Sequence, residues 1–312
     1  VRNCLNGING TILAYGQTGS GKTHSLLSQG ADDEDWGLLP RIVFSLFVQI
    51  ARDEANVYEV EAGALQVYNE EVDDLLHGGH RSGGNANLGV QKGGVVPGLT
   101  WVPCRHPDDM LDLFARARAN IVYAETKMNK GSSRSHAVMQ IRVSKRARVR
   151  AVQEGQRQRV ELKRSRLCIV DLAGSERMKK SGAEGLRLRE ANRINQSLLA
   201  LGNVMSALAR RKPHVPMRDS KLTRVLEGSL GGGCKTVLLI CCGPSAGSAQ
   251  ETINTLEFAA RAMSITVSAR VNTDIVEVDA QSLLRDLRQD PRLEALRQAT
   301  GRAAEGAPAL GK

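Results

Sequence analysis

A glycine-rich stretch near the start of the chain constrains the fold more than any other feature. Gly16–Thr23 reads G-Q-T-G-S-G-K-T, follows the apolar run Thr11–Tyr15, and leads into the helix-forming stretch Lys22–Leu27. This order of strand, glycine loop and helix is typical of a loop whose backbone N–H groups bind phosphate oxygens at the positive end of a helix. The alternative is a glycine-rich turn that only joins two elements.

The same pattern predicts roles for individual loop residues. Lys22 is placed to reach the β- and γ-phosphates of a nucleotide, and Thr23 is placed to hold Mg²⁺. His24 directly follows the loop and is expected near the base. The residues expected to contact the nucleotide are Gly16, Gln17, Thr18, Gly19, Ser20, Gly21, Lys22, Thr23 and His24.

A second chemical landmark lies at Leu167–Glu176. An apolar run typical of a buried strand ends at Asp171, and Gly174 follows three residues later. Beside a phosphate loop, such an aspartate is placed to hold Mg²⁺ through water, and the glycine N–H can sense the γ-phosphate. The alternative is an aspartate that caps a loop. The presence of the glycine loop at Gly16 favours the nucleotide interpretation.

Composition limits the classes of protein that the chain can belong to. Its 312 residues allow one large domain or two small ones, and 43 Lys and Arg against 33 Asp and Glu give a net charge of +10. The surrounding field should therefore attract a polyanion. Because aromatic residues are only 3% of the chain, base stacking on rings is disfavoured and nucleic acid is not the expected partner.

Cysteine spacing and hydropathy indicate the compartment. The six cysteines include no C-x-x-C pair and several lie in apolar runs, so we expect reduced core residues rather than disulfides or a zinc site. The apolar run Val237–Cys242 is too short to cross a bilayer. These patterns favour a soluble protein of the cytoplasm without membrane insertion.

Hydrophobic periodicity predicts alternating strands and helices. We expect strands near residues 58–68, 137–143 and 167–171, and helices near 108–121, 190–209 and 249–262. The strand at Thr236–Cys242 is expected in the core. In the helix at 249–262, we expect Ile253, Leu256 and Phe258 to face inward. The basic stretch Lys145–Arg166 is expected to form two strand ends and a solvated tip.

Four separated segments together resemble one family, the kinesin motor domain. They are Gly16–Thr23, the S-S-R-S-H segment that ends at His136, the D-L-A-G-S-E segment from Asp171, and H-V-P-M-R-D-S-K-L-T-R from His214 to Arg224. The resemblance runs from about Gly10 to Asn272. It implies a P-loop NTPase fold with three α/β/α layers around a mixed, mostly parallel sheet, and a microtubule-stimulated ATPase that uses ATP and Mg²⁺.

The resemblance also implies roles for the switch segments. Ser132 and Ser133 would belong to switch I, with Ser133 approaching Mg²⁺ and the backbone near Ser132 placing the attacking water. Arg134 would pair with Glu176 of switch II when the site closes, while Gly174 donates its N–H to the γ-phosphate. Such a site mainly positions water and offsets charge. The alternative for Arg134 and Glu176 is an ordinary surface ion pair.

Microtubule contacts are implied for three basic segments, and the alternative is that these charges only solubilise the protein. We expect localisation to the cytoplasm and the microtubule cytoskeleton. The residues implied in the contact are Arg177, Lys179, Lys180, Arg210, Arg211, Lys212, Arg218, Lys221 and Arg224.

The resemblance divides the chain into three parts. Residues 1–272 would be a motor domain that lacks its first strands and helix, 273–300 the end of a neck linker with a short neck-like helix, and 301–312 a disordered tail. The absent first strand would lie beside Thr236–Cys242, so we expect a truncated product. Dimerisation is possible through segments that are not in this chain, and plus-end direction is weakly favoured.

Two rival functions remain at this point. A microtubule-binding protein with an impaired motor core would bind tubulin without turnover. A signalling GTPase shares the phosphate loop and the D-x-x-G segment, but the chain has no N-K-x-D segment for reading guanine.

Overall fold

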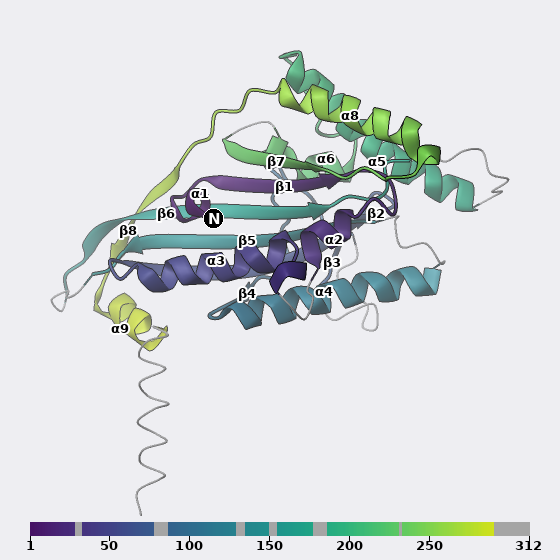
Figure 1. Cartoon of the computed structure of the whole chain (residues 1–312). Coiled ribbons are helices and arrows are strands. Elements are labelled where there is room, and N and C mark those ends of the chain that lie inside the picture. The colour runs from purple at the N-terminus through teal and green to yellow at the C-terminus, as the bar shows by residue number, and fades with distance from the viewer. Residues whose placement is uncertain are drawn as a thin grey trace, which may run out of the picture.

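Figure 1 shows a computed structural model of the chain, in which a twisted sheet lies between two layers of helices. The structure describes residues 1–28, 33–77, 87–128, 135–149, 155–176, 186–230 and 233–289. The expected switch I residues Ser132, Ser133 and Arg134 lie outside these ranges. The same is true of Arg177, Lys179 and Lys180, and of the segment 301–312.

The described strands form one mixed sheet in the order β3-β2-β5-β6-β1-β7, with β4 paired to β2 and β8 paired to β6. The strands are β1 (Asn9–Tyr15), β2 (Asn56–Tyr68), β3 (Glu71–Asp74), β4 (Val102–Pro103), β5 (His136–Ala147), β6 (Gln158–Asp171), β7 (Cys234–Ile240) and β8 (Asn272–Val278).

The expected mixed sheet is confirmed, but its described pairings are mostly antiparallel rather than mostly parallel. Only β1 pairs in parallel, with β6 on one side and β7 on the other. The remaining described pairings, from β2 to β3, β4 and β5 and from β6 to β5 and β8, are antiparallel. Antiparallel neighbours need only short connections, as between β5 and β6 in the basic stretch. The parallel part, β6-β1-β7, lies at one end of the described sheet, and there the chain crosses over through helices.

Helices cover both faces of the sheet (Figure 1). One buried cluster joins the sheet to the first four helices, and a second joins it to the next four. The first four are α1 (Arg2–Leu5), α2 (Lys22–Leu27), α3 (Leu38–Arg52) and α4 (Pro107–Met128). The next four are α5 (Leu186–Ala209), α6 (Lys221–Val225), α7 (Glu227–Leu230) and α8 (Ala249–Met263). The three-layer α/β/α arrangement is therefore confirmed.

Two expectations about the core were wrong. Strand β7 lies at the sheet edge, where it pairs with β1 alone among the described strands, and Val237 is 58% exposed. In α8, Ile253 and Leu256 are also largely exposed. Phe258 is buried as expected, stacked on Tyr15 with ring centroids 3.9 Å apart. This stack fixes which stripe of α8 faces the sheet, and the helical period of 3.6 places Ile253 and Leu256 off that stripe.

The C-terminal segment continues the sheet. Strand β8 pairs antiparallel with the first half of β6, and α9 (Ala280–Gln289) follows it. The backbone N–H of Asn272 donates to the Gly7 carbonyl at 2.8 Å, and its side-chain amide donates to the same carbonyl at 2.9 Å. In α9, Asp286 is buried and accepts a hydrogen bond from Arg146 of β5. The end of the chain that is described is thus attached to the sheet at two places.

The six cysteines are free, as expected, and five of them are buried while Cys242 is exposed. Among the residues that the structure describes, no group of three or more His, Cys, Asp or Glu side chains is arranged to hold a metal ion. No helix in the described part is long and apolar enough to span a membrane.

Candidate nucleotide site

The glycine loop and the switch II segment meet because the strands before them are parallel neighbours. Ala14 of β1 is in register with Asp171 of β6, so both strands end at the same edge of the sheet. The backbone N–H of Ser175 then donates to the Gly16 carbonyl at 3.1 Å. Ligands of open α/β sheets bind outside the carboxyl ends of such strands. The pairing of β1 with β6 therefore brings together two segments that lie about 155 positions apart in the chain.

Gly16 is required by a close approach of the backbone. Its φ is +154°, and an added Cβ would lie 2.0 Å from the Cys241 carbonyl oxygen. Gly21, with φ of +95°, is the residue that precedes α2. A left-handed residue at this point turns the chain sharply, which directs the loop around the N-terminus of the helix. The glycines thus serve the loop geometry that the sequence pattern predicts.

Lys22 lies inside the loop rather than in solvent. It is only 7% exposed, and its ammonium group donates to the carbonyl oxygens of Gly16 at 2.9 Å and Gln17 at 3.0 Å. Burial lowers the pKa of Lys22, and the carboxylates of Asp171 and Glu176 oppose that shift. The ammonium group is therefore held inside the loop by two neutral carbonyl oxygens.

Thr23 and Asp171 form a pair of oxygen donors beside Lys22. The Thr23 hydroxyl donates to Asp171 Oδ2 at 2.5 Å, and Asp171 Oδ1 is buried without a hydrogen-bond partner among the described residues. Burial raises the pKa of Asp171, opposed by the Thr23 hydrogen bond and by Lys22. Hydroxyl and carboxylate oxygens are the ligands that Mg²⁺ prefers. The residues present therefore fit a magnesium ion.

Glu176 closes over the loop. Its carboxylate accepts the backbone N–H of Thr18 at 2.8 Å and the Thr18 hydroxyl at 2.5 Å. An added Cβ at Gly174 would lie 2.2 Å from the Thr18 hydroxyl oxygen, so switch II packs tightly on the loop at this point. A carboxylate thus occupies donors that a phosphate oxygen would otherwise use.

His136 connects three parts of this region and received no role from the sequence. Its ring Nδ1 accepts the backbone N–H of Ala173 at 3.0 Å, and its Nε2 lies 2.9 Å from the Ser197 hydroxyl. The ring is 2% exposed, and burial, with Lys22 nearby, lowers its pKa to about 3. The signal in the sequence was its place at the end of the S-S-R-S-H segment and at the start of an apolar strand, which did not indicate what the ring contacts.

The structure also places the remaining loop residues. The Gln17 side-chain amide donates to Ser248 at 2.9 Å, and the Ser20 hydroxyl donates to the Gln17 carbonyl at 2.8 Å. Gly19 and His24 are exposed. The structure therefore brings together Gly16–Thr23, Asp171, Gly174 and Glu176.

The basic residues after α5 lie on the side of the sheet opposite α3 and α4. Arg210, Arg211, Lys212 and Arg218 are exposed. The helix ends because Arg211 has a φ of +49°, which lets the Lys212 N–H donate back to the Ala207 carbonyl at 2.9 Å. Cations at a helix C-terminus also interact favourably with its dipole.

Two further basic residues are held by neighbours. Arg224 pairs with Glu227 at 2.8 Å, so part of its charge is already compensated. Lys221 donates its backbone N–H to Glu70 at 2.7 Å, and Glu70 also accepts the Ser220 hydroxyl at 2.7 Å. Glu70 belongs to the turn between β2 and β3 and has a φ of +63°. The strained turn therefore anchors the start of α6.

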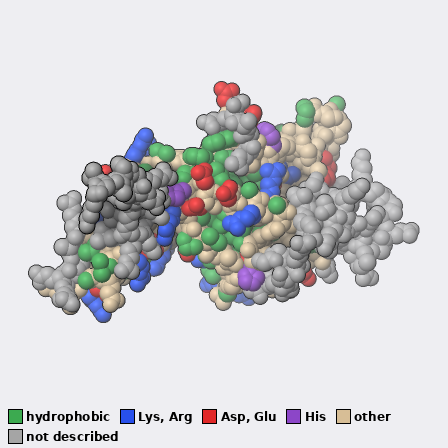
Figure 2. Space-filling view, turned by 90° about the horizontal axis from the view of Figure 1, so that it is seen from below, with side chains coloured by type: hydrophobic (Ala, Val, Ile, Leu, Met, Phe, Trp, Pro, Cys, Tyr) green, Lys and Arg blue, Asp and Glu red, His purple; other side chains and the backbone are tan. Residues whose placement is uncertain are grey.

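The helix face on the other side has a different character. Figure 2 views the molecule from the side of α4, and acidic side chains gather there among hydrophobic ones near the middle of the face. Lys and Arg side chains lie close to these acidic ones on the same face.

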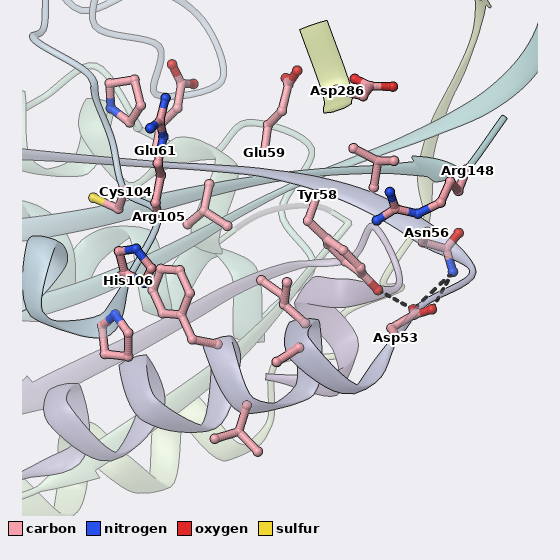
Figure 3. Close-up of a pocket in the computed structure, with 18 residues that line it drawn as sticks. Asp53, Asn56, Tyr58, Glu59, Glu61, Cys104, Arg105, His106, Arg148 and Asp286 are labelled. Carbon is pink, nitrogen blue, oxygen red and sulfur yellow. Dashed lines mark hydrogen bonds between the residues drawn. The ribbon is translucent and has the colours of Figure 1, made fainter. Parts of the chain in front are cut away.

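A hollow of about 640 Å³ opens on this side, at the C-terminal end of α3 and remote from the glycine loop. Figure 3 shows Tyr58 pointing into it, with its hydroxyl 2.6 Å from an Asp53 oxygen. Asp53 also accepts a hydrogen bond from the Asn56 side-chain amide and pairs with Lys145 at 3.3 Å. Burial raises the pKa of Asp53, but these partners outweigh it and lower the pKa to about 2. The polar groups are thus engaged with one another, which favours a structural role for them.

Comparison with known proteins decides the family. A profile of the kinesin motor domain matches residues 1–265 of the 312. The chain belongs to the kinesin motor domain family. It is 42% identical over 278 residues to the kinesin-1 heavy chain of Homo sapiens, in a match that covers 88% of this chain and 28% of the human protein. The kinesin heavy chain of Syncephalastrum racemosum is 41% identical over 291 residues, which cover 91% of this chain and 30% of that protein.

A solved kinesin structure confirms the fold. A fast kinesin, whose structure was analysed for its ATPase mechanism and its interactions with microtubules, matches with a TM-score of 0.76 and 40% identity. The match covers 88% of this chain and 75% of that one. The kinesin chain described here spans less than a third of the length of the two heavy chains above.

Proposed function

We propose that this chain is the ATP-hydrolysing core of a microtubule-dependent motor, which couples nucleotide state to microtubule binding and movement. Family membership supports this proposal, and one observation in the structure carries it. Lys22, Thr23 and Asp171 meet at the end of two parallel strands, with an unpaired buried oxygen on Asp171. This arrangement suits the phosphates of ATP and a magnesium ion.

The loop would bind ATP by exchanging partners. When a nucleotide binds, the Lys22 ammonium group would leave the Gly16 and Gln17 carbonyls and pair with the phosphate oxygens. Thr23, Ser133 and, through water, Asp171 would hold Mg²⁺. The metal would neutralise charge that develops on the phosphate oxygens.

The switch residues would then position the attacking water. Glu176 leaves Thr18 and pairs with Arg134, which frees the Thr18 N–H for a phosphate oxygen. Gly174 donates its N–H to the γ-phosphate, and the backbone near Ser132 orients the water. Glu176 would also accept the water's proton and pass it onward. Hydrolysis would therefore require that the contact between Glu176 and Thr18 be broken first.

The microtubule would bind on the side of α5 and α6. The exposed cations Arg210, Arg211, Lys212 and Arg218 suit an acidic protein surface, and the attraction would weaken with salt. Arg224 would contribute less as a point charge, because it pairs with Glu227 within the fold. The hydrogen bond from Lys221 to Glu70 comes from the backbone N–H and does not involve the ammonium group. Arg177, Lys179 and Lys180 complete the proposed surface. We place the protein on the microtubule cytoskeleton of the cytoplasm.

The C-terminal segment would deliver the mechanical output. We infer that residues 1–272 are the motor domain and that residues 273–300, which include most of β8 and all of α9, are the docked end of a neck linker with a short neck-like helix. The antiparallel ladder from β8 to β6 and the buried contact between Asp286 and Arg146 support this interpretation.

Steady-state ATPase activity of the intact protein, with and without microtubules, tests the proposal. We expect the rate to rise with microtubule concentration and then saturate. If microtubules co-sediment the protein but leave the rate unchanged, the alternative of a non-motile microtubule-binding protein is selected. If neither binding nor stimulation occurs, both functions are excluded.

A further inference from the structure

His136 joins elements that are expected to move relative to one another. It is the first residue of β5 and the last residue of the S-S-R-S-H segment, and it contacts Ala173 of switch II and Ser197 of α5. Ala173 and Ser197 lie 24 positions apart. The imidazole contacts both of them, so switch II and α5 are linked through one side chain as well as through the backbone between them.

The two ring nitrogens have different tasks, and the geometry fixes both. Because the backbone N–H of Ala173 can only donate, Nδ1 must be the acceptor of that 3.0 Å hydrogen bond. The neutral ring then carries its proton on Nε2, which donates to the Ser197 hydroxyl at 2.9 Å. The ring, 2% exposed, and the Ser197 side chain, 3% exposed, are both enclosed.

Because His136 is buried, breaking either of its two hydrogen bonds leaves a polar group without a partner. If switch II moved away from His136, the Ala173 N–H or the ring nitrogen would be left buried without a partner, at a cost in free energy. The cost is avoided if the ring and the helix move together. A shift of switch II therefore favours a matching shift of α5.

We propose that His136 is a positioning residue that couples the γ-phosphate-sensing loop to α5, and through that helix to the basic surface at its C-terminal end. Arg210, Arg211 and Lys212 follow α5 directly, so a displacement of the helix alters how these cations are presented. The inference rests on the proposed function. It adds a specific residue and a specific pair of hydrogen bonds to it.

Three substitutions separate the two hydrogen bonds. Ser197→Ala removes the acceptor on α5 and leaves the contact with Ala173. His136→Asn keeps an acceptor near the position of Nδ1 and loses the reach to Ser197. His136→Gln keeps a donor near the position of Nε2 and loses the acceptor for Ala173. The control is Ser206→Ala, because among the described residues the Ser206 hydroxyl bonds only to the Gly202 carbonyl of the same helix, at 2.8 Å.

The decisive readout is the coupling between sites. In the intact protein, the microtubule dissociation constant is measured by co-sedimentation with ADP and with a non-hydrolysable ATP analogue, and the ratio of the two constants is the coupling factor. We expect the factor to move towards 1 by about tenfold in Ser197→Ala, and to keep its wild-type value in Ser206→Ala. A role in stability alone would lower Tm without moving this ratio.

Hydrogen exchange provides the second measurement. We expect the Ala173 amide to exchange faster in His136→Gln but not in Ser197→Ala. A wild-type coupling factor in Ser197→Ala and in every folded His136 variant would overturn the inference and leave the proposed function intact. A factor of 1 in the wild type would overturn the proposed function together with it. If the His136 variants fail to fold, Ser197→Ala alone decides.

Discussion

The Thr23 hydroxyl and the Asp171 carboxylate lie 148 positions apart in the chain and meet at 2.5 Å. Because Asp171 Oδ1 has no partner among the described residues, this pair is incomplete in a way that a cation would complete. Thr23→Ala should therefore weaken Mg²⁺-dependent ATP binding by about tenfold or more, which corresponds to a hydrogen bond with a charged partner.

Thr23→Ser is the matched control, since it keeps the hydroxyl. We expect the serine variant to bind ATP within about threefold of the wild type in a titration with a fluorescent ATP analogue at several Mg²⁺ concentrations. Equal losses in the alanine and serine variants would show that the threonine methyl group, rather than the hydroxyl, is what matters.

Glu176 competes with phosphate for the donors of Thr18. Glu176→Gln should lower the rate of ATP hydrolysis by about 100-fold or more, because the residue that accepts the proton of water is lost. It should leave ATP affinity unchanged or tighter, because a negative charge beside the loop is removed. Single-turnover hydrolysis and equilibrium binding separate the two effects. Glu257→Gln, an exposed site on α8, is the control. A parallel fall in affinity and rate would argue against the competition.

His136 should make stability depend on pH. Its pKa falls from an ordinary value of 6.5 to about 3 in the folded state, mainly through burial. The unfolded chain therefore takes up a proton below pH 6.5 that the folded chain does not. The contribution to stability is complete above that pH and is lost as the pH falls towards 3.

The lowered pKa of His136 predicts a measurable change in the free energy of unfolding with pH. Between pH 7 and pH 5.5, protonation of His136 in the unfolded state should lower the free energy of unfolding by about 1 kcal/mol. Chemical denaturation at both pH values measures it. The His136→Gln variant should lose less stability over the same range, whatever its absolute stability. Identical pH slopes in the two proteins would contradict the assignment of a neutral buried ring.

The cations at the end of α5 should act through charge. Replacing Arg210 with Gln and Arg211 with Gly should weaken microtubule binding by about fivefold at low salt and less at high salt, where screening is stronger. Glycine at position 211 suits the left-handed φ of +49°, so the helix end is preserved. The matched control is the pair Arg52→Gln and Arg116→Gln, two exposed residues on α3 and α4. Equal effects of both pairs would indicate a non-specific dependence on net charge.

The sequence predicted the phosphate loop well because that loop is a local structure. Strand, glycines, lysine and threonine follow one another, and the close approach of Gly16 to Cys241 explains why the pattern is specific. It also predicted the apolar run that ends at Asp171. That the two strands are parallel neighbours in register could not be read from either segment, because pairing depends on the whole sheet.

Other features depended on neighbours that a local pattern does not contain. The burial of Ile253 and Leu256 was wrongly predicted, since the stack of Tyr15 on Phe258 sets the orientation of α8. The exposure of Val237 on β7 was missed because the apolar composition of that strand suits a buried strand equally well. The bridge through His136 needed the positions of Ala173 and Ser197, which come from two different elements.

A double-mutant cycle on Thr23 and Asp171 tests the central claim most directly, namely that the two residues serve one magnesium-bound nucleotide. The affinity for ATP in the presence of Mg²⁺ is measured for Thr23→Ala, Asp171→Asn and the double variant. Residues that share one ligand show strong coupling, so we predict that the double variant binds ATP no more weakly than the worse single variant. Losses that add in full would contradict a shared site.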